Sequence, residues 1–150
     1  MESQKNKKMH EKLILNIISR KIESIQKKFE LDLPGINNFL RGDKVHVGGF
    51  NISIDCACSL NVYFKDLKNS DDEGVVLEVH ISKSPSYIFS IDVDLIRSNG
   101  QAFAMDDFTI DLRKEKSVRC KVFADLYNAI DNYYDLMKKI IQEEYLSRLV

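Results

Sequence analysis

The sequence predicts an α+β fold, in which an antiparallel meander of four to five strands is flanked by N- and C-terminal amphipathic helices packed on one sheet face. Three observations predict it: a helical apolar period at both ends, strict alternation of apolar and polar residues between them, and turn residues separating the alternating segments. The chain has 150 residues, 44% apolar and 30% charged, which is ordinary for a globular protein. We expect a single domain over residues 1–150.

The first helix is predicted over residues 10–30, where apolar side chains recur at every third or fourth position. The apolar stripe consists of Leu13, Ile14, Ile17, Ile18, Ile22, Ile25 and Phe29. Pro34 ends the pattern, because proline cannot continue the hydrogen-bond ladder of a helix. Residues 36–43 are expected to form a connector, and residues 44–47 a short strand.

Residues 51–64 give the strongest local signal, because they alternate without a fault. Ile52, Ile54, Cys56, Cys58, Leu60, Val62 and Phe64 share one face. The pattern indicates a strand with one buried and one solvated side. Further strands are predicted over 75–83, 87–97 and 103–112. In the last of these the apolar phase changes, which predicts a β-bulge at Asp106 and Asp107.

A second long helix is predicted from Val118 onward, with Ser117 as its N-cap. Its length of about 46 Å, at 1.5 Å per residue, matches that of the longest strand. Tyr134 and Tyr145 are candidates for an exposed dimer contact, although packing in the core is favoured for the tyrosines of this helix.

The three cysteines suggest a reducing compartment rather than a metal site. Cys56 and Cys58 lie on the same side of one strand, so they are either metal ligands or small core residues. A zinc site usually needs two further Cys or His at a recognisable spacing, which the sequence lacks. The apolar run after the N-terminal lysines is too interrupted for an export signal. We therefore expect a cytoplasmic protein.

The net charge of −1 hides an uneven distribution of charge. The balance is +4 over residues 1–44, −7 over residues 45–112 and +2 over residues 113–150. An acidic sheet is thus combined with basic helices. This sign argues against nucleic-acid binding by the sheet.

The alternation predicts that the sheet carboxylates point away from the helices, with no Lys or Arg at outward positions within the strands. Asp106 or Asp107 is expected to join them near the bulge. The predicted partner-binding residues are Asp55, Tyr63, Glu78, His80, Asp92, Asp94 and Asp111. Like charges on neighbouring strands are unfavourable, so this face is interpreted as complementary to a basic partner. The plainer alternative is that these acids only keep a wet face soluble.

The function predicted from this pattern is a non-enzymatic protein-binding module, most consistent with an immunity or antitoxin-type inhibitor of a toxic nuclease. Three alternatives remain: a dimeric secretion or effector chaperone, a metal-dependent enzyme that uses the sheet carboxylates with His80 as base, and a small-ligand carrier with a cavity between helix and sheet. No catalytic, cofactor-binding or metal-binding residue is assigned. We expect no cofactor and no nucleic-acid or membrane partner, and the sequence leaves a homodimer open.

Overall fold

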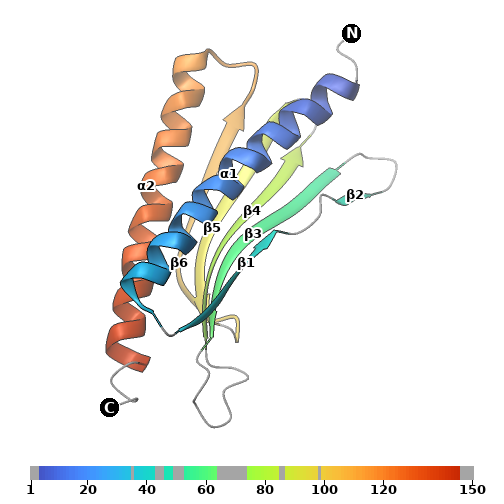
Figure 1. Cartoon of the computed structure of the whole chain (residues 1–150). Coiled ribbons are helices and arrows are strands. Elements are labelled where there is room, and N and C mark those ends of the chain that lie inside the picture. The colour runs from blue at the N-terminus through green and yellow to red at the C-terminus, as the bar shows by residue number, and fades with distance from the viewer. Residues whose placement is uncertain are drawn as a thin grey trace.

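The computed structural model describes residues 4–34, 36–42, 46–48, 53–63, 74–84, 87–97 and 99–145. Side chains are described for a narrower set: 13–34, 36, 57–63, 74–82, 87–97 and 99–144. The predicted fold is confirmed. Figure 1 shows an antiparallel sheet with both long helices on the same face. The predictions for residues 64–73, for Gly49 and for the side chains of Cys56 and Tyr145 concern parts of the chain outside the described residues.

The elements follow one another as a helix, a run of strands and a second helix. Their bounds are α1 Gln4–Asp32, β1 Asn37–Gly42, β2 His46–Gly48, β3 Ser53–Tyr63, β4 Gly74–Ser84, β5 Ile88–Arg97, β6 Ala102–Asp111, α2 Lys116–Ile140 and a π-helical turn Ile141–Tyr145. The described strands form one sheet in the order β1-β3-β4-β5-β6, and β2 also pairs with β3. No described helix has the combination of length and apolar character that crossing a membrane requires.

The connector predicted over residues 36–43 is wrong, because most of it is strand β1. This strand pairs antiparallel with β3, from Asn37 opposite Tyr63 to Gly42 opposite Cys58. Its sequence has too few alternating residues to predict a strand locally. The pairing instead satisfies backbone groups along the edge of β3, which is a tertiary effect that local pattern does not reveal.

The predicted bulge exists in β6, but its predicted position is wrong. One register holds from Ile88 opposite Asp111 to Leu95 opposite Ala104, and the next pair joins Ile96 to Ala102. Phe103 is therefore the extra residue, and Arg97 lies 4.5 Å above its ring centre. Because the register is unbroken at residues 106 and 107, Asp106 faces the helices and Asp107 faces the opposite side.

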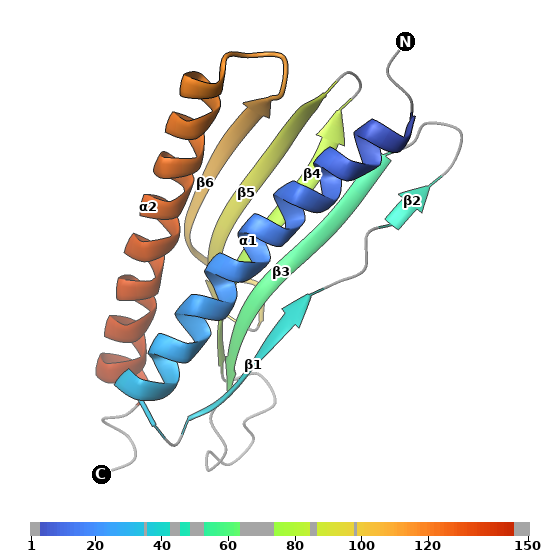
Figure 2. The ribbon, with the colours of Figure 1, turned by 45° about the horizontal axis from the view of Figure 1, so that its top comes forward.

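Figure 2 shows both helices over one face of the sheet, and the core residues lie between that face and the helices. The apolar stripe of α1 is buried at Ile14, Ile18, Ile22, Ile25 and Phe29. Against it pack the inward rows of β3 to β6 and the buried side of α2, which carries Leu126, Ile130, Tyr134 and Met137.

Two expectations for α2 are corrected by the structure. Tyr134 is not an exposed dimer contact, since only 1% of it is accessible and its ring meets Phe29 edge-on at 6.4 Å. Ser117 is not the N-cap, because the helix starts at Lys116 and Glu115 is the capping residue, without a side-chain hydrogen bond to the backbone. The first turn of α2 is therefore uncapped by any side chain.

Candidate functional site

We call the face of the sheet opposite α1 and α2 the helix-free face. Its carboxylates lie in two neighbouring cross-strand rows. The first row runs Ser59, Glu78, Asp94 and Met105 across β3 to β6. The second runs Ala57, His80, Asp92 and Asp107 across the same strands. Since directly opposite residues in antiparallel strands have Cβ atoms roughly 4.5–5.5 Å apart, the rows bring four carboxylates into one cluster. We call Glu78, Asp92, Asp94 and Asp107 the acidic cluster.

The register gathers four of the seven predicted partner-binding residues at this place: Glu78, His80, Asp92 and Asp94. Asp107 is the fourth carboxylate of the cluster. The sequence pattern predicts it there only as an alternative to Asp106. Tyr63 is opposite Gly74, roughly 13 Å along the strand from Ser59 at about 3.3 Å per residue. Asp55 is opposite Ser82, but its side chain lies outside the described set.

The surroundings of Asp92 disfavour the ionised form of its carboxyl group. A hydrogen bond between its carboxyl group and that of Asp107 raises the pKa of Asp92, and burial and the charges of Asp107 and Asp94 raise it further. Only the nearby His80 lowers it. Two carboxylates this close cannot both ionise without repulsion. Among the described side chains, no cation offsets these unfavourable effects on ionised Asp92 in full.

The ionised form of Asp94 is also disfavoured, but here the main cause is burial. Desolvation raises its pKa, the charge of Asp107 raises it further, and His80 opposes the shift. Its Oδ1 atom is buried and accepts no hydrogen bond. A buried acceptor without a donor is costly, so the ionised form of this carboxylate is destabilised in the folded protein.

Within the strands, no described outward-facing side chain belongs to Lys or Arg, as the alternation predicted. The register does place Arg41 of β1 opposite Ser59, at the end of the first row. The side chain of Arg41 is not among those described. Within the described set, His80 is the only basic side chain beside the acidic cluster.

Asp111 was expected to be one of the uncompensated carboxylates, and this is wrong. Arg113 donates from Nε and from a terminal nitrogen to the two carboxylate oxygens, each at 3.0 Å, and its backbone nitrogen donates at 2.9 Å. These bonds lower the pKa of Asp111 to about 2. Asp111 is thus neutralised by its own chain and separated from the acidic cluster.

Asp106 has a structural role on the helix side of the sheet. Tyr133 of α2 donates a hydrogen bond of 2.7 Å to its Oδ2 atom. Burial raises the pKa of Tyr133, and the bond to Asp106 raises it further, so the phenol stays protonated. The sequence shows the helical spacing of the tyrosines. It does not show which aspartate Tyr133 contacts, because the bulge is predicted at the wrong residues.

The side of β3 that was expected to be solvated is instead buried where it lies beside the acidic cluster. Ala57, Ser59 and Asn61 are small and buried, with Asn61 donating to the Ser59 hydroxyl at 3.3 Å. Met105, in the first row, is 63% exposed. Methionine is enriched in protein–protein interfaces, so Met105 is a side chain beside the cluster that a partner could contact.

The described residues give little support to a metal or thiol chemistry. None of their His, Cys, Asp and Glu side chains form a group of three or more that could hold a metal ion. Cys58 is buried, with its Sγ 3.2 Å from the Ser19 hydroxyl, as expected for a core cysteine. Comparisons with protein-family models, curated proteins and solved structures find no match to this chain.

Proposed function

We propose that this chain is a non-enzymatic binding protein that uses the acidic cluster to bind and neutralise a basic partner protein. The most fitting role of this kind is an immunity or antitoxin-type inhibitor of a toxic nuclease. One observation carries the proposal. Four carboxylates are gathered on the helix-free side of the sheet, and no Lys or Arg lies among the described outward-facing side chains within its strands.

The chemistry of the two surfaces is complementary. A nuclease binds a polyanion, so its cleft carries Lys and Arg at high density. A carboxylate cluster can occupy such a cleft, and complementary charge raises the rate of association well above that of neutral proteins. Partner cations would also offset the repulsion between Asp92 and Asp107.

The proposal places the protein in the cytoplasm, where a toxic nuclease would need to be inhibited. Cys120 is exposed and Cys58 is buried, and neither of these two takes part in a disulfide. Cysteines outside disulfides are typical of reducing compartments, whereas exported proteins tend to use cysteines as disulfides.

The proposal is tested by measuring how salt affects binding to a partner captured from cells. The partner is identified, purified and checked for nuclease activity that the chain suppresses. We expect the association rate to fall steeply as salt rises through the range where exposed charges become screened. Replacing Asp92 and Asp94 together by asparagine should lower that rate and flatten its dependence on salt.

The control variant removes the same charge from the helices. Asp125→Asn with Glu30→Gln changes two exposed carboxylates on α2 and α1. It should leave the salt dependence close to that of the unchanged chain. An association rate that ignores salt, or that falls equally in both double variants, would contradict binding through the acidic cluster.

A further inference from the structure

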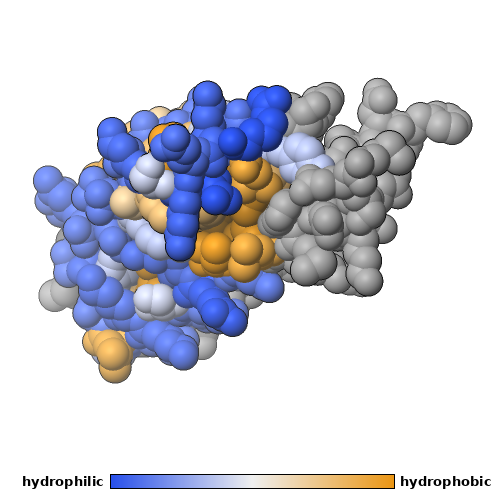
Figure 3. Space-filling model, turned by 90° about the horizontal axis from the view of Figure 1, so that it is seen from above, coloured by the Kyte–Doolittle hydropathy of each residue, from blue (hydrophilic) through white to orange (hydrophobic). Residues whose placement is uncertain are grey.

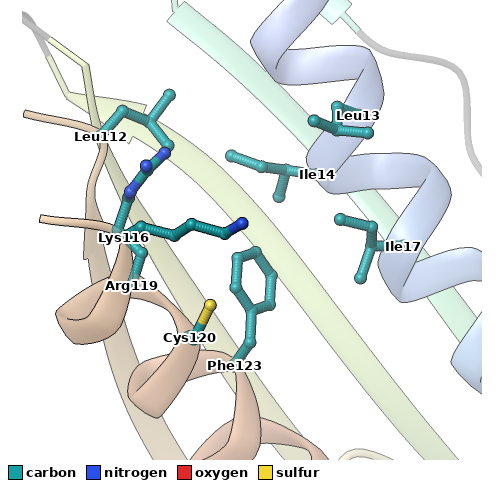
Figure 4. A pocket seen from close by; sticks show the side chains of 8 residues that line it. All are labelled: Leu13, Ile14, Ile17, Leu112, Lys116, Arg119, Cys120 and Phe123. Atoms are coloured by element: carbon teal, nitrogen blue, oxygen red, sulfur yellow. The ribbon is translucent and has the colours of Figure 1, made fainter.

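A second feature of the molecule is an apolar pocket between the N-terminal halves of the two long helices. Its volume is about 270 Å³. Leu13, Ile14, Ile17, Leu112, Lys116, Arg119, Cys120 and Phe123 line it (Figure 4). Seen from the end where both helices begin, apolar surface lies open between hydrophilic regions (Figure 3). This end of the molecule is distinct from the acidic cluster, which lies on the other side of the sheet.

The pocket exists because the two helices diverge toward their N-termini, as Figures 1 and 2 show. Their described mutual contacts lie further along both helices. Lys21 pairs with Asp131 at 2.6 Å, and Tyr134 donates to Asp32 at 2.7 Å. Nearer the N-termini, Leu13 of α1 is 57% exposed although it belongs to the apolar stripe. Apolar area thus remains uncovered where a ligand could cover it.

Two cationic side chains, Lys116 and Arg119, line this apolar pocket, and both belong to the first turn of α2. Lys116 extends from α2 into the space between the helices (Figure 4). Arg119 also lines the pocket, and its Nε atom is buried without a hydrogen-bond partner. Among the described residues, no carboxylate forms an ion pair with either side chain.

The helix itself increases the preference for an anion at this point. The N-terminus of a helix carries partial positive charge, which acidic residues normally offset. The first turn of α2 has no acidic residue, and Glu115 makes no capping bond through its side chain. Lys116 and Arg119 therefore add positive charge where it is already unfavourable, and a bound anion would relieve this.

We propose that this pocket binds a small amphiphile with one apolar chain and one carboxylate, of the medium-chain fatty acid class. The apolar walls would take the chain, and Lys116 and Arg119 would take the carboxylate. The volume is slightly below that of pockets for drug-sized ligands, so it suits a single short acyl chain and not a helix of another protein. The site is independent of the proposed partner-binding face.

The probe for this proposal is decanoate, titrated into the full chain by calorimetry. Decanol, which has the same chain without the charge, and decyltrimethylammonium, which has the opposite charge, serve as controls. We expect decanoate to bind and both controls to bind at least about tenfold more weakly. Bound decanoate should also slow alkylation of Cys120, read from the peptide that contains it by mass spectrometry.

Two variants locate the site. Lys116→Gln with Arg119→Gln should weaken decanoate binding about tenfold, whereas the matched control Lys121→Gln with Lys139→Gln should leave it unchanged. Leu13→Asp, at an exposed position, should weaken binding through the chain of the ligand. Circular dichroism checks that each variant remains folded.

Three outcomes would overturn the proposal. Equal binding of decanol and decanoate would show that no anion subsite exists. Absence of decanoate binding at millimolar concentration would exclude this ligand class, and binding of an acidic amphipathic peptide instead would assign the pocket to a protein segment. Binding of the basic partner should be unaffected by every one of these variants, which separates failure here from failure of the proposed function.

Discussion

Replacing Tyr134 by alanine is expected to lower the free energy of unfolding by about 3–5 kcal/mol, the usual cost of truncating a buried aromatic side chain. Tyr134 is 1% exposed, and its ring packs edge-on against Phe29 of α1. The loss would be a large part of the roughly 5–15 kcal/mol that stabilises a typical domain. Urea unfolding measures it.

Tyr134→Phe is the matched control, because it keeps the ring and removes only the hydroxyl. That hydroxyl donates to Asp32, and Lys138 lies 3.2 Å from the same carboxylate oxygen. Asp32 is exposed, so water can replace the lost donor and the loss should be much smaller. An equal loss in the free energy of unfolding for both variants would mean that the ring contributes little to the packing of α2 against α1. This result would contradict a core role for Tyr134.

Replacing Asp92 and Asp94 together by lysine is expected to weaken binding of the basic partner by at least about 100-fold, or about 2.7 kcal/mol. Charge reversal places like charges opposite one another across the interface, which costs several kcal/mol. Calorimetry or surface binding with the captured partner measures the change, and loss of nuclease inhibition should accompany it.

The isolated double-lysine variant should nevertheless remain folded. Both positions lie on the helix-free face and are partly accessible, so a lysine can keep its ammonium group in water. A lysine at position 92 would face Asp107, and one at position 94 would face Glu78. Opposite charges on neighbouring strands stabilise a sheet. A folded variant that binds the partner as tightly as before would rule out the acidic cluster as the binding surface.

The sequence is sufficient to predict the elements in which the apolar period continues over many residues. The stripe of α1 and the alternation of β3 each repeat often enough to identify a buried side, and one buried side fixes which residues face away from the helices. This is why Glu78, Asp92 and Asp94 could be placed on one face before their neighbours were known.

What the sequence could not supply was pairing between segments. The alternation of each strand leaves the register open, so the meeting of Asp92 with Asp107 follows only from the position of the bulge at Phe103. The same holds for β1, whose partner is distant in the chain. The pairing of Asp111 with Arg113 depends on how the chain turns after β6, and the strand period ends there.

The sequence leaves open a cavity between helix and sheet as one alternative, whereas the pocket lies between the two helices. Helical periodicity places Leu13, Ile14 and Ile17 on the buried stripe, but it does not give the angle between two helices. That angle decides whether the stripe is covered along its whole length, and it is set by contacts such as those of Lys21 and Asp32.

The carboxylates of the acidic cluster repel one another, and among the described side chains only His80 offsets part of their charge. The most direct test is the free energy of unfolding of Asp92→Asn in the absence of any partner. The side chain then loses its charge, and its amide can donate to Asp107. At pH 7 we expect a gain of roughly 0.2–1 kcal/mol, the range found for cross-strand pairs.

The pH dependence of this gain follows from the raised pKa of Asp92. The repulsion acts in full above the pKa of the folded state, weakens as the pH falls through it, and is gone below the ordinary value of 3.8. Urea unfolding of both proteins, with Asp125→Asn as the control on α2, should therefore show an advantage for Asp92→Asn at pH 7 that disappears in acid. A lower free energy of unfolding for Asp92→Asn at pH 7, with the control unchanged, would show that the chain already neutralises this carboxylate and would contradict the account.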